Sequence, residues 1–270
     1  MKQEHHKKSH FHDHQHAAEF DQRAAKSEIR GQLAIRLIEM LKLGGEEWIL
    51  DLATGTGRFA RPVSQRLGGG RIVGLDEALA MLRVSRENKH EAIPSYIQTA
   101  GDAESLPFRI GVFDRAFVCF SLHHFGRPAS VAREMLRVLK PGGRFVVLDP
   151  VLAEPRDALD RALDNKVNQV FRRTHGENFR FHSAEGIRSL LSGAGFRIAR
   201  LDLPRFSFDQ DGMEGIPTGR HWLEVAEELA DENAELAHRF QENYFRWKRQ
   251  GEKVHVQGSF AYALVCGEKS

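Results

Sequence analysis

The sequence has few cysteines, no long apolar run and almost no net charge, and each of these features excludes a class of protein. Only two cysteines occur in 270 residues. Two are too few for a disulfide framework, so we expect a cytoplasmic protein. No apolar run approaches the roughly 20 residues that a membrane-spanning helix needs, and the polar N-terminus does not look like a signal sequence. The net charge of +2 comes from 39 basic and 37 acidic residues, so nothing indicates a nucleic-acid-binding protein.

Patterns typical of strands and helices alternate along much of the chain. With 41% hydrophobic residues, the chain can bury a sizeable core as one large α/β domain or two small ones. Alternation at this spacing predicts a parallel sheet with helices on both faces. We expect strands over 48–52, 71–75, 96–100, 112–120, 144–148, 196–203 and 259–266, and helices over 29–43, 58–67, 78–90, 127–139, 157–171 and 184–191, with one or two more within 219–250.

The N-terminal region is rich in histidine. Six histidines lie among Lys, Gln and Ser in residues 1–16. We expect a disordered, solvated tail there. Neutral imidazoles also ligate zinc, nickel and copper, so adventitious or real metal binding stays open. No acid or cysteine pattern fixes a coordination geometry, so we assign no metal site. Residues 17–45 follow as an N-terminal helical segment that ends at Gly44-Gly45.

The segment 46–57 organises the first half of the chain. Residues 48–52 form a short apolar strand, and Ala-Thr-Gly-Thr-Gly follows at once over 53–57. Glycines at a helix N-terminus bring bare backbone N–H groups up to a ligand. Asp51, near the end of the strand, would repel a pyrophosphate but suits a cationic ligand or an amino group. The loop therefore favours a positively charged ligand.

Other predicted strands also end at residues that can bind a ligand. In open α/β sheets, ligands bind beyond the carboxyl ends of the strands. Asp76 ends the second strand, and its carboxylate could accept two hydrogen bonds side by side from ribose hydroxyls. Asp102 follows the third strand and could accept a hydrogen bond from an exocyclic amine. His123 and His124 follow the fourth strand, and Asp149 follows the fifth. Taken singly, each carboxylate could equally belong to a turn or a helix cap.

Residues 55–60 also fit the Gly-x-Gly-x-x-Gly/Ala fingerprint of dinucleotide sites, but this short pattern is a weak signal. Three features argue against NAD. Asp51 would repel the pyrophosphate, an Asp-Ala-Glu-Ser-Leu-Pro-Phe segment lies at 102–108, and a Leu-Lys-Pro-Gly-Gly turn lies at 139–143. An NAD-linked oxidoreductase is therefore a distant alternative.

Five motifs, in order and at fitting spacing, resemble a known family. They lie at 49–57, 73–76, 101–108, 113–114 and 137–143. They look like class I S-adenosylmethionine-dependent methyltransferases, and within that class they are most similar to the group containing the ubiquinone/menaquinone-biosynthesis C-methyltransferases. The resemblance implies an α/β, Rossmann-like fold with a seven-stranded, mostly parallel sheet, an antiparallel last strand, helices on both faces and a helical lid before that strand. One departure is Ala53, where the family pattern has glycine.

The resemblance also implies a cofactor and its contacts. S-adenosyl-L-methionine would bind, with S-adenosyl-L-homocysteine as the product. Asp51 would orient the amino-acid part, Asp76 would hold the ribose hydroxyls, and Asp102 would take the adenine amine. The residues implied in cofactor binding are Asp51, Ala53, Thr54, Gly55, Thr56, Gly57, Asp76, Glu77, Met81, Asp102, Ala103, Phe120 and Ser121.

Catalysis and substrate binding fall to other residues. His123 is the candidate general base, since the ordinary imidazole pKa of about 6.5 suits proton transfer near neutrality. Packing or capping of the next helix is the alternative role for this histidine. A helical insertion over 209–253, with the segment 150–182, would roof the site and offer an aromatic wall to a flat or greasy molecule. Simple packing of a lid on the sheet edge is the alternative here. The residues assigned to the substrate are His124, Phe171, Trp222 and Tyr244.

We therefore expect a methyltransferase that acts on a small, apolar or aromatic molecule at carbon or oxygen. Its catalytic domain would cover 46–208 and 254–270. The alternative is a catalytically idle protein that binds S-adenosylmethionine, or one that responds to metal through its histidine tail. We expect a small-molecule substrate, no nucleic-acid partner and no membrane span, and we leave a homodimer open.

Overall fold

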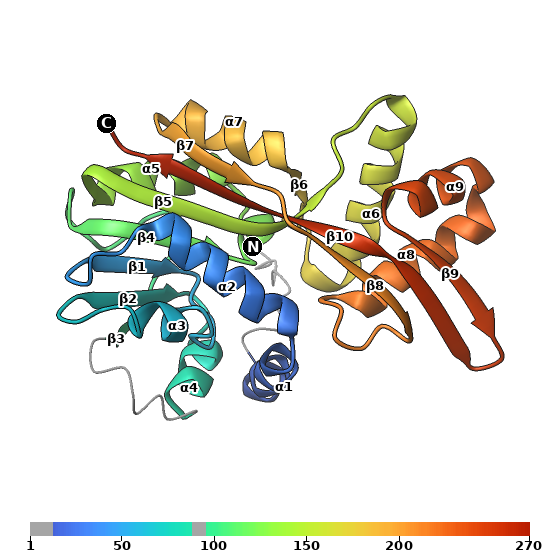
Figure 1. Cartoon of the computed structure of the whole chain (residues 1–270), viewed down its shortest axis with the longest axis horizontal. Helices are drawn as coiled ribbons and strands as arrows, with labels where there is room; N and C mark the ends of the chain where they lie inside the picture. The colour runs from blue at the N-terminus through green and yellow to red at the C-terminus, as the bar shows by residue number, and fades with distance from the viewer. Residues whose placement is uncertain (1–12, 88–95) are drawn as a thin grey trace, which may run out of the picture.

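The computed structural model describes residues 13–87 and 96–270, which form one large twisted sheet flanked by helices (Figure 1). The strands are β1 (Trp48–Leu52), β2 (Arg71–Asp76), β3 (Tyr96–Ala100), β4 (Phe113–Cys119), β5 (Leu139–Leu152), β6 (His182–Ser183), β7 (Arg197–Asp202), β8 (Arg205–Asp211), β9 (Phe245–Gln250) and β10 (Lys253–Glu268). The helices are α1 (His14–Ala25), α2 (Glu28–Leu41), α3 (Ala60–Ser64), α4 (Leu79–Glu87), α5 (Pro128–Val138), α6 (Ala158–His175), α7 (Ala184–Ala194), α8 (Gly219–Glu232) and α9 (Ala234–Asn243), with a 3₁₀ turn at Leu122–His124.

The central part of the sheet has the strand order β3-β2-β1-β4-β5-β10-β7. β1 pairs in parallel with β2 and β4, β2 with β3, and β4 with β5. Parallel neighbours of this kind need crossover connections, which the intervening helices provide. β10 runs antiparallel to both β5 and β7. The predicted Rossmann-like sheet with an antiparallel last strand is therefore confirmed.

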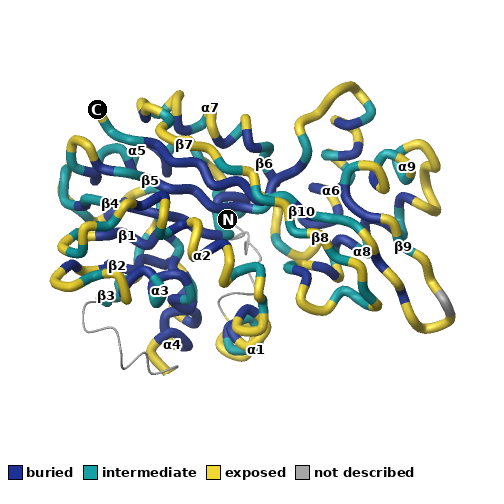
Figure 2. The backbone as a smooth tube through the Cα atoms, viewed as in Figure 1, coloured by how far each residue is buried: buried dark blue, intermediate teal, exposed yellow. Residues whose placement is uncertain are grey.

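Both faces of this sheet are buried. Side chains alternate between the faces of a strand, and in β1 Ile49 joins the core cluster that contains Leu37 of α2. Its neighbour Leu50 joins a second cluster, which contains Ile187 of α7. The inner strands β1, β2, β4 and β5 are accordingly buried along most of their length, whereas the edge strands β3 and β7 and the outer faces of the helices are partly or fully exposed (Figure 2). A strand covered on both faces reads as a continuous apolar run, which explains why these strands are visible in the sequence.

The N-terminal half of β10 continues past the central sheet and builds a second lobe (Figure 1). It pairs antiparallel with β8 on one side and with β9 on the other. Helices α6, α8 and α9 contribute Val167, Val225 and Phe240 to the core that covers these strands. A Cβ added at Gly258 of β10 would lie 2.3 Å from the Cβ of Phe245, so only glycine allows β9 to approach this closely.

The prediction that the insertion over 209–253 is helical is wrong in part. α8 and α9 are present, but β8 extends to Asp211 and a strand, β9, follows α9. The spacing of Phe240, Tyr244 and Trp247 predicts one face of a helix. Trp247 instead lies in this strand, so that prediction is wrong. Apolar and basic residues alternate at the start of β9. Over so short a run, this period of two is easily mistaken for part of a helical pattern.

Several predicted boundaries also differ. His14 and His16 lie in α1, so the predicted disordered tail ends too late in the sequence; residues 1–12 lie outside the described part of the chain. β5 starts at Leu139 and runs through the predicted turn at 141–143, and α3 is shorter than expected. The two cysteines are buried free thiols in strands, as predicted. Within 13–87 and 96–270, no helix is both long and apolar enough to cross a membrane.

Candidate active site

Asp51 lies in β1, one residue before its end, with its side chain buried; the residue is 2% exposed. Its Oδ2 accepts a hydrogen bond of 2.6 Å from the hydroxyl of Thr54, which lies 2.7 Å from the hydroxyl of Tyr96 on β3. Burial raises the pKa of Asp51 to about 8; the Thr54 hydrogen bond opposes this rise, and the charge of Asp76 adds to it. In the described part of the chain, no cationic side chain pairs with Asp51. A cationic ligand would therefore stabilise the ionised form of this carboxyl group.

The loop that follows β1 turns sharply at three residues with left-handed backbone conformations. Ala53, Gly55 and Gly57 have φ angles of 52°, 55° and 76°. Glycine adopts this region without a steric penalty, whereas an alanine there costs about 1 kcal/mol. The glycine that the family pattern has at position 53 therefore has a conformational reason, and Ala53 occupies the same conformation under strain. The turn brings the loop backbone across the carboxyl end of β1.

Asp76 is also buried, but its carboxylate has backbone partners. Its Oδ2 accepts a hydrogen bond from the N–H of Gly55, and its Oδ1 accepts one from the N–H of Ala78, both at 2.8 Å. Asp76 thus ties the glycine loop to the start of α4. A carboxylate oxygen can accept more than one hydrogen bond, so this arrangement is compatible with the predicted contact to ribose hydroxyls. The neighbouring Glu77 is exposed.

The other predicted cofactor residues lie at the ends of β3 and β4. Asp102 is exposed, and its Oδ1 accepts a hydrogen bond of 2.8 Å from the N–H two residues further on. Ala103 is partly buried beside it. Phe120 follows β4 with a φ of 55°, a strained conformation of the kind found at functional sites. The hydroxyl of Ser121 donates to the carbonyl oxygen of Cys119 at 3.1 Å. The carboxyl edge of the sheet therefore carries all these residues, as predicted for open α/β sheets.

Helix α1 packs against this edge, and the sequence reading did not predict that contact. Ala17 of α1 and Met81 of α4 lie in one small apolar cluster. The carboxylate of Asp21 accepts a hydrogen bond of 2.6 Å from the hydroxyl of Thr56 and forms an ion pair with Arg58. These contacts join α1 to the glycine loop across 35 positions of sequence. The only signal in the sequence is an acid on the apolar side of a helix, which does not reveal its partner.

His123 and Asp149 form a buried pair. His123 is 7% exposed in the 3₁₀ turn after β4, and its Nδ1 lies 2.8 Å from Oδ2 of the fully buried Asp149. The backbone N–H of His123 also donates to this oxygen, at 3.2 Å. With a carboxylate facing Nδ1, that nitrogen carries the proton and Nε2 has the lone pair. The ring of His124 lies 4.3 Å from that of His123, measured between centroids.

Three of the four predicted substrate residues lie deeper in the same aromatic cluster. Phe179 connects this cluster to the His123–Asp149 pair. The centroid of its ring lies 5.0 Å from that of His123 and 5.2 Å from that of Phe171. Phe171 in turn lies 5.3 Å from Trp222, which lies 5.0 Å from Tyr244. Phe171, Trp222 and Tyr244 are all buried. Trp222 and Tyr244 therefore pack the second lobe behind Phe171, which agrees with the alternative role of lid packing.

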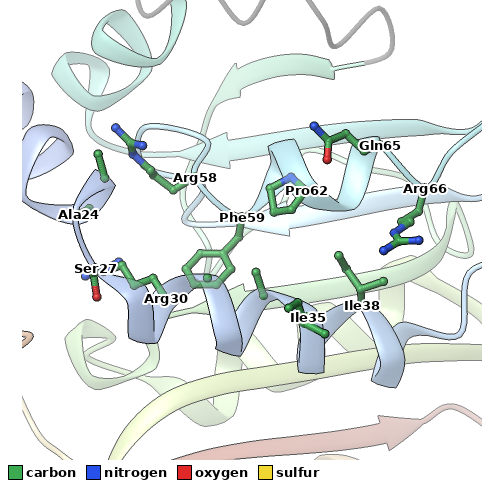
Figure 3. Close-up of a pocket in the computed structure, with 13 residues that line it drawn as sticks. Ala24, Ser27, Arg30, Ile35, Ile38, Arg58, Phe59, Pro62, Gln65 and Arg66 are labelled. Carbon is green, nitrogen blue, oxygen red and sulfur yellow. The ribbon is translucent and has the colours of Figure 1, made fainter. Parts of the chain in front are cut away.

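A groove of about 360 Å³ lies between α2 and the segment that leads into α3, beside the glycine loop (Figure 3). Ile38, Phe59 and other apolar side chains line it, together with Arg30 and Arg58. The guanidinium carbon of Arg30 lies 4.3 Å from the centre of the Phe120 ring. Arg30 thus both lines the groove and contacts the ring of Phe120, a residue predicted to bind the cofactor. Neither arginine was identified from the sequence.

Residues 50–147 match a family model described as a methyltransferase domain. A demethylmenaquinone methyltransferase of Corynebacterium kroppenstedtii is 41% identical over 103 residues, which cover 38% of this chain and 42% of that relative. A ubiquinone/menaquinone biosynthesis C-methyltransferase of Idiomarina loihiensis is 34% identical over 164 residues, covering 55% of this chain and 65% of the relative. The chain therefore spans less than two thirds of the length of either relative.

The fold is similar to that of the YcgJ protein of Bacillus subtilis, with a TM-score of 0.69, 22% identity, and coverage of 87% of this chain and 97% of that one. At this level of identity the likeness concerns the fold. The family match contains the glycine loop, Asp76, Asp102 and His123 but ends before Asp149. Helix α1, Arg30 and the second lobe also lie outside it.

Proposed function

We infer that this chain carries a class I S-adenosylmethionine-dependent methyltransferase domain, and we propose that it methylates a small, flat aromatic molecule at carbon or oxygen. The domain follows from the match over residues 50–147 and from the fold. The cofactor is the one that the sequence motifs predict. The substrate class, the catalytic residues and the cofactor contacts are our proposal.

The observation that carries this proposal is the electrostatic state of Asp51. Its carboxyl group is buried, lacks a cationic partner among the described residues and has its pKa raised by burial to about 8. A ligand with an ammonium group and a sulfonium group supplies the missing positive charge, whereas a diphosphate would repel the ionised carboxylate. We propose that Asp51 binds the amino end of the cofactor, Asp76 its ribose and Asp102 its adenine.

When bound, S-adenosylmethionine supplies a methyl group on a cationic sulfur, and loss of that methyl leaves neutral S-adenosylhomocysteine. The chain's own contribution would be to align the acceptor, exclude water and remove a proton. Asp149 holds Nδ1 of His123 at 2.8 Å, which leaves the Nε2 lone pair to accept the acceptor's proton. The resulting imidazolium would be stabilised by the same carboxylate. We therefore assign His123 as the general base and Asp149 as the residue that positions it.

The proposed substrate class rests on what surrounds His123. Phe179 and Phe181 lie within 5.6 Å of its ring, measured between centroids, and His124 lies nearer still. Aromatic side chains recognise flat apolar rings by stacking and edge contacts. One of the two relatives is named as a demethylmenaquinone methyltransferase, and the other as a C-methyltransferase of ubiquinone/menaquinone biosynthesis. A phenol or hydroquinone fits these surroundings, since its hydroxyl proton is acidic enough for a histidine base.

The test measures binding and turnover separately. Calorimetry should show that the purified chain binds S-adenosylhomocysteine and ignores NADH. Labelled S-adenosylmethionine should then transfer its methyl group to a member of a panel of phenols, hydroquinones and amines. His123→Ala should slow this transfer strongly without changing the affinity for S-adenosylhomocysteine. Binding without any transfer would favour the catalytically idle alternative, and no binding at all would refute the proposal.

A further inference from the structure

Arg30 lies in the first turns of α2, and its guanidinium points at the carboxyl edge of the sheet. The guanidinium carbon lies 4.3 Å from the centre of the Phe120 ring and 5.4 Å from that of Phe20. Phe120 follows β4 in its strained conformation, next to the site where the methionine part of the cofactor is expected. The cation is therefore held between two aromatic faces at the edge of the proposed cleft.

No carboxylate neutralises this cation within the described residues. The nearby ionisable groups are Tyr262, Cys119 and Arg58. Arg58 is itself paired with Asp21, so the carboxylate of Asp21 is already engaged. Burial lowers the pKa of Arg30 to about 10, and Arg58 contributes to the decrease. A partly buried guanidinium without a counter-ion costs free energy, which a bound anion would recover.

A second unsatisfied donor lies in the same groove. The hydroxyl of Ser27 is buried and has no hydrogen-bond partner among the described residues. Ser27, Arg30 and Arg58 all line the groove between α2 and α3 (Figure 3). A hydroxyl can donate as well as accept, and a guanidinium only donates. This end of the groove therefore offers N–H and O–H donors with few acceptors, which is the chemistry of an anion site.

We propose that Arg30 is the anion-binding residue of the catalytic cleft, and that its guanidinium binds a carboxylate or an aryl oxyanion of a bound molecule. The inference rests on the proposed function. Two sources have this chemistry: the carboxylate at the methionine end of the cofactor, and the phenolate form of the acceptor. A carboxylate would accept two parallel hydrogen bonds from the guanidinium fork, one at each oxygen, whereas a phenolate would accept at its single oxygen.

The experiment compares two ligands that differ in the carboxylate. Arg30→Met keeps the length of the side chain and removes the charge, and Arg36→Met on the exposed face of α2 is the matched control. If the carboxylate is bound, Arg30→Met should weaken S-adenosylhomocysteine binding about 10- to 100-fold and leave 5′-methylthioadenosine, which lacks the amino-acid end, unchanged. If the acceptor's oxyanion is bound, neither ligand should change. The ternary complex with 4-nitrophenol should then lose the yellow phenolate form that the wild-type complex stabilises.

A structural role for Arg30 would give different results. Loss of a structural contact would weaken both nucleosides equally and lower the melting temperature of the ligand-free protein. Removal of an uncompensated cation should instead leave that temperature equal or higher. An equal loss of affinity for both nucleosides overturns the proposal. So does a variant in which neither affinity changes and 4-nitrophenol still binds as the phenolate. Arg30→Lys, which keeps the charge but not the fork, should show a smaller loss than Arg30→Met. Failure of the wild-type chain to bind S-adenosylhomocysteine would instead refute the proposed function itself.

Discussion

Substitution of Asp51 by asparagine should make the ligand-free protein more stable near pH 8 and bind the cofactor less tightly. In the folded state the pKa of Asp51 is about 8, against an ordinary value of 3.8. Between these values the folded protein keeps a proton that the unfolded chain has lost. The free energy of unfolding therefore falls as the pH rises from about 4 to 8, by at most about 6 kcal/mol. Relaxation around the buried charge reduces this figure, so we expect a gain of about 2 kcal/mol for the variant at pH 8.

The assay is urea unfolding of the wild type and the variant at pH 5, 6.5 and 8, with calorimetry of S-adenosylhomocysteine in parallel. The wild type should lose stability across this series relative to Asp51→Asn, and its affinity for the ligand should rise with pH as the carboxylate ionises. The variant should bind about 10- to 100-fold more weakly at pH 8, because it lacks a charged hydrogen-bond acceptor for the ammonium group. Asp231→Asn, at an exposed position of α8, should change neither property. A variant less stable than the wild type at pH 8, with a parallel pH dependence, would refute this electrostatic reasoning.

Three further predictions concern other parts of the chain. His123→Ala and Asp149→Asn should each lower the single-turnover rate about 10²- to 10⁴-fold, with cofactor affinity unchanged; an unaltered rate in either variant would remove that residue from catalysis. Asp21→Asn should speed the dissociation of S-adenosylhomocysteine in stopped flow and expose the α1–α2 junction to trypsin, because it weakens the tie between α1 and the glycine loop. Glu19→Gln on the same helix is the control, and equal rates would exclude such a tie. Gly258→Ala should lower the free energy of unfolding by about 1–3 kcal/mol in urea titrations, since its Cβ would clash with β9; an unchanged midpoint would contradict that packing.

Local patterns were sufficient for the parallel half of the fold. Strand β1 is apolar except for Asp51 and is followed by a glycine loop, so its position and the turn after it follow from local pattern and backbone sterics alone. The same reasoning placed Asp51 and Asp76 at the carboxyl edge of the sheet. It did not find β9, because a six-residue strand with basic residues resembles the end of a helix. The difference lies in burial, since a half-exposed strand such as β9 depends on partners elsewhere in the chain.

The contacts that complete the candidate site could not be read from the sequence for a related reason. Asp21 and Thr56 are 35 residues apart, and His123 and Asp149 are 26 apart. The sequence can suggest each of these residues alone but not its partner. A single acid or histidine is more often a helix cap or a packing residue. The pairing depends on how far each strand extends and on which helix covers it. For Arg30, the informative fact is the lack of a counter-ion within the described residues, which only the assembled structure reveals.

Two buried carboxylates meet at the glycine loop, and their different partners explain why this loop suits a cation. Asp76 accepts two backbone N–H groups, which stabilise its ionised form. In the part of the chain that the structure describes, Asp51 accepts a hydrogen bond from the Thr54 hydroxyl, and the nearby charge of Asp76 raises its pKa further. A diphosphate at this loop would add negative charge to both carboxylates, whereas an ammonium group relieves their repulsion. Binding sites for both classes of ligand therefore contain the glycine pattern. The acid four residues before its first glycine, Asp51, distinguishes the site for a cation from the site for a diphosphate.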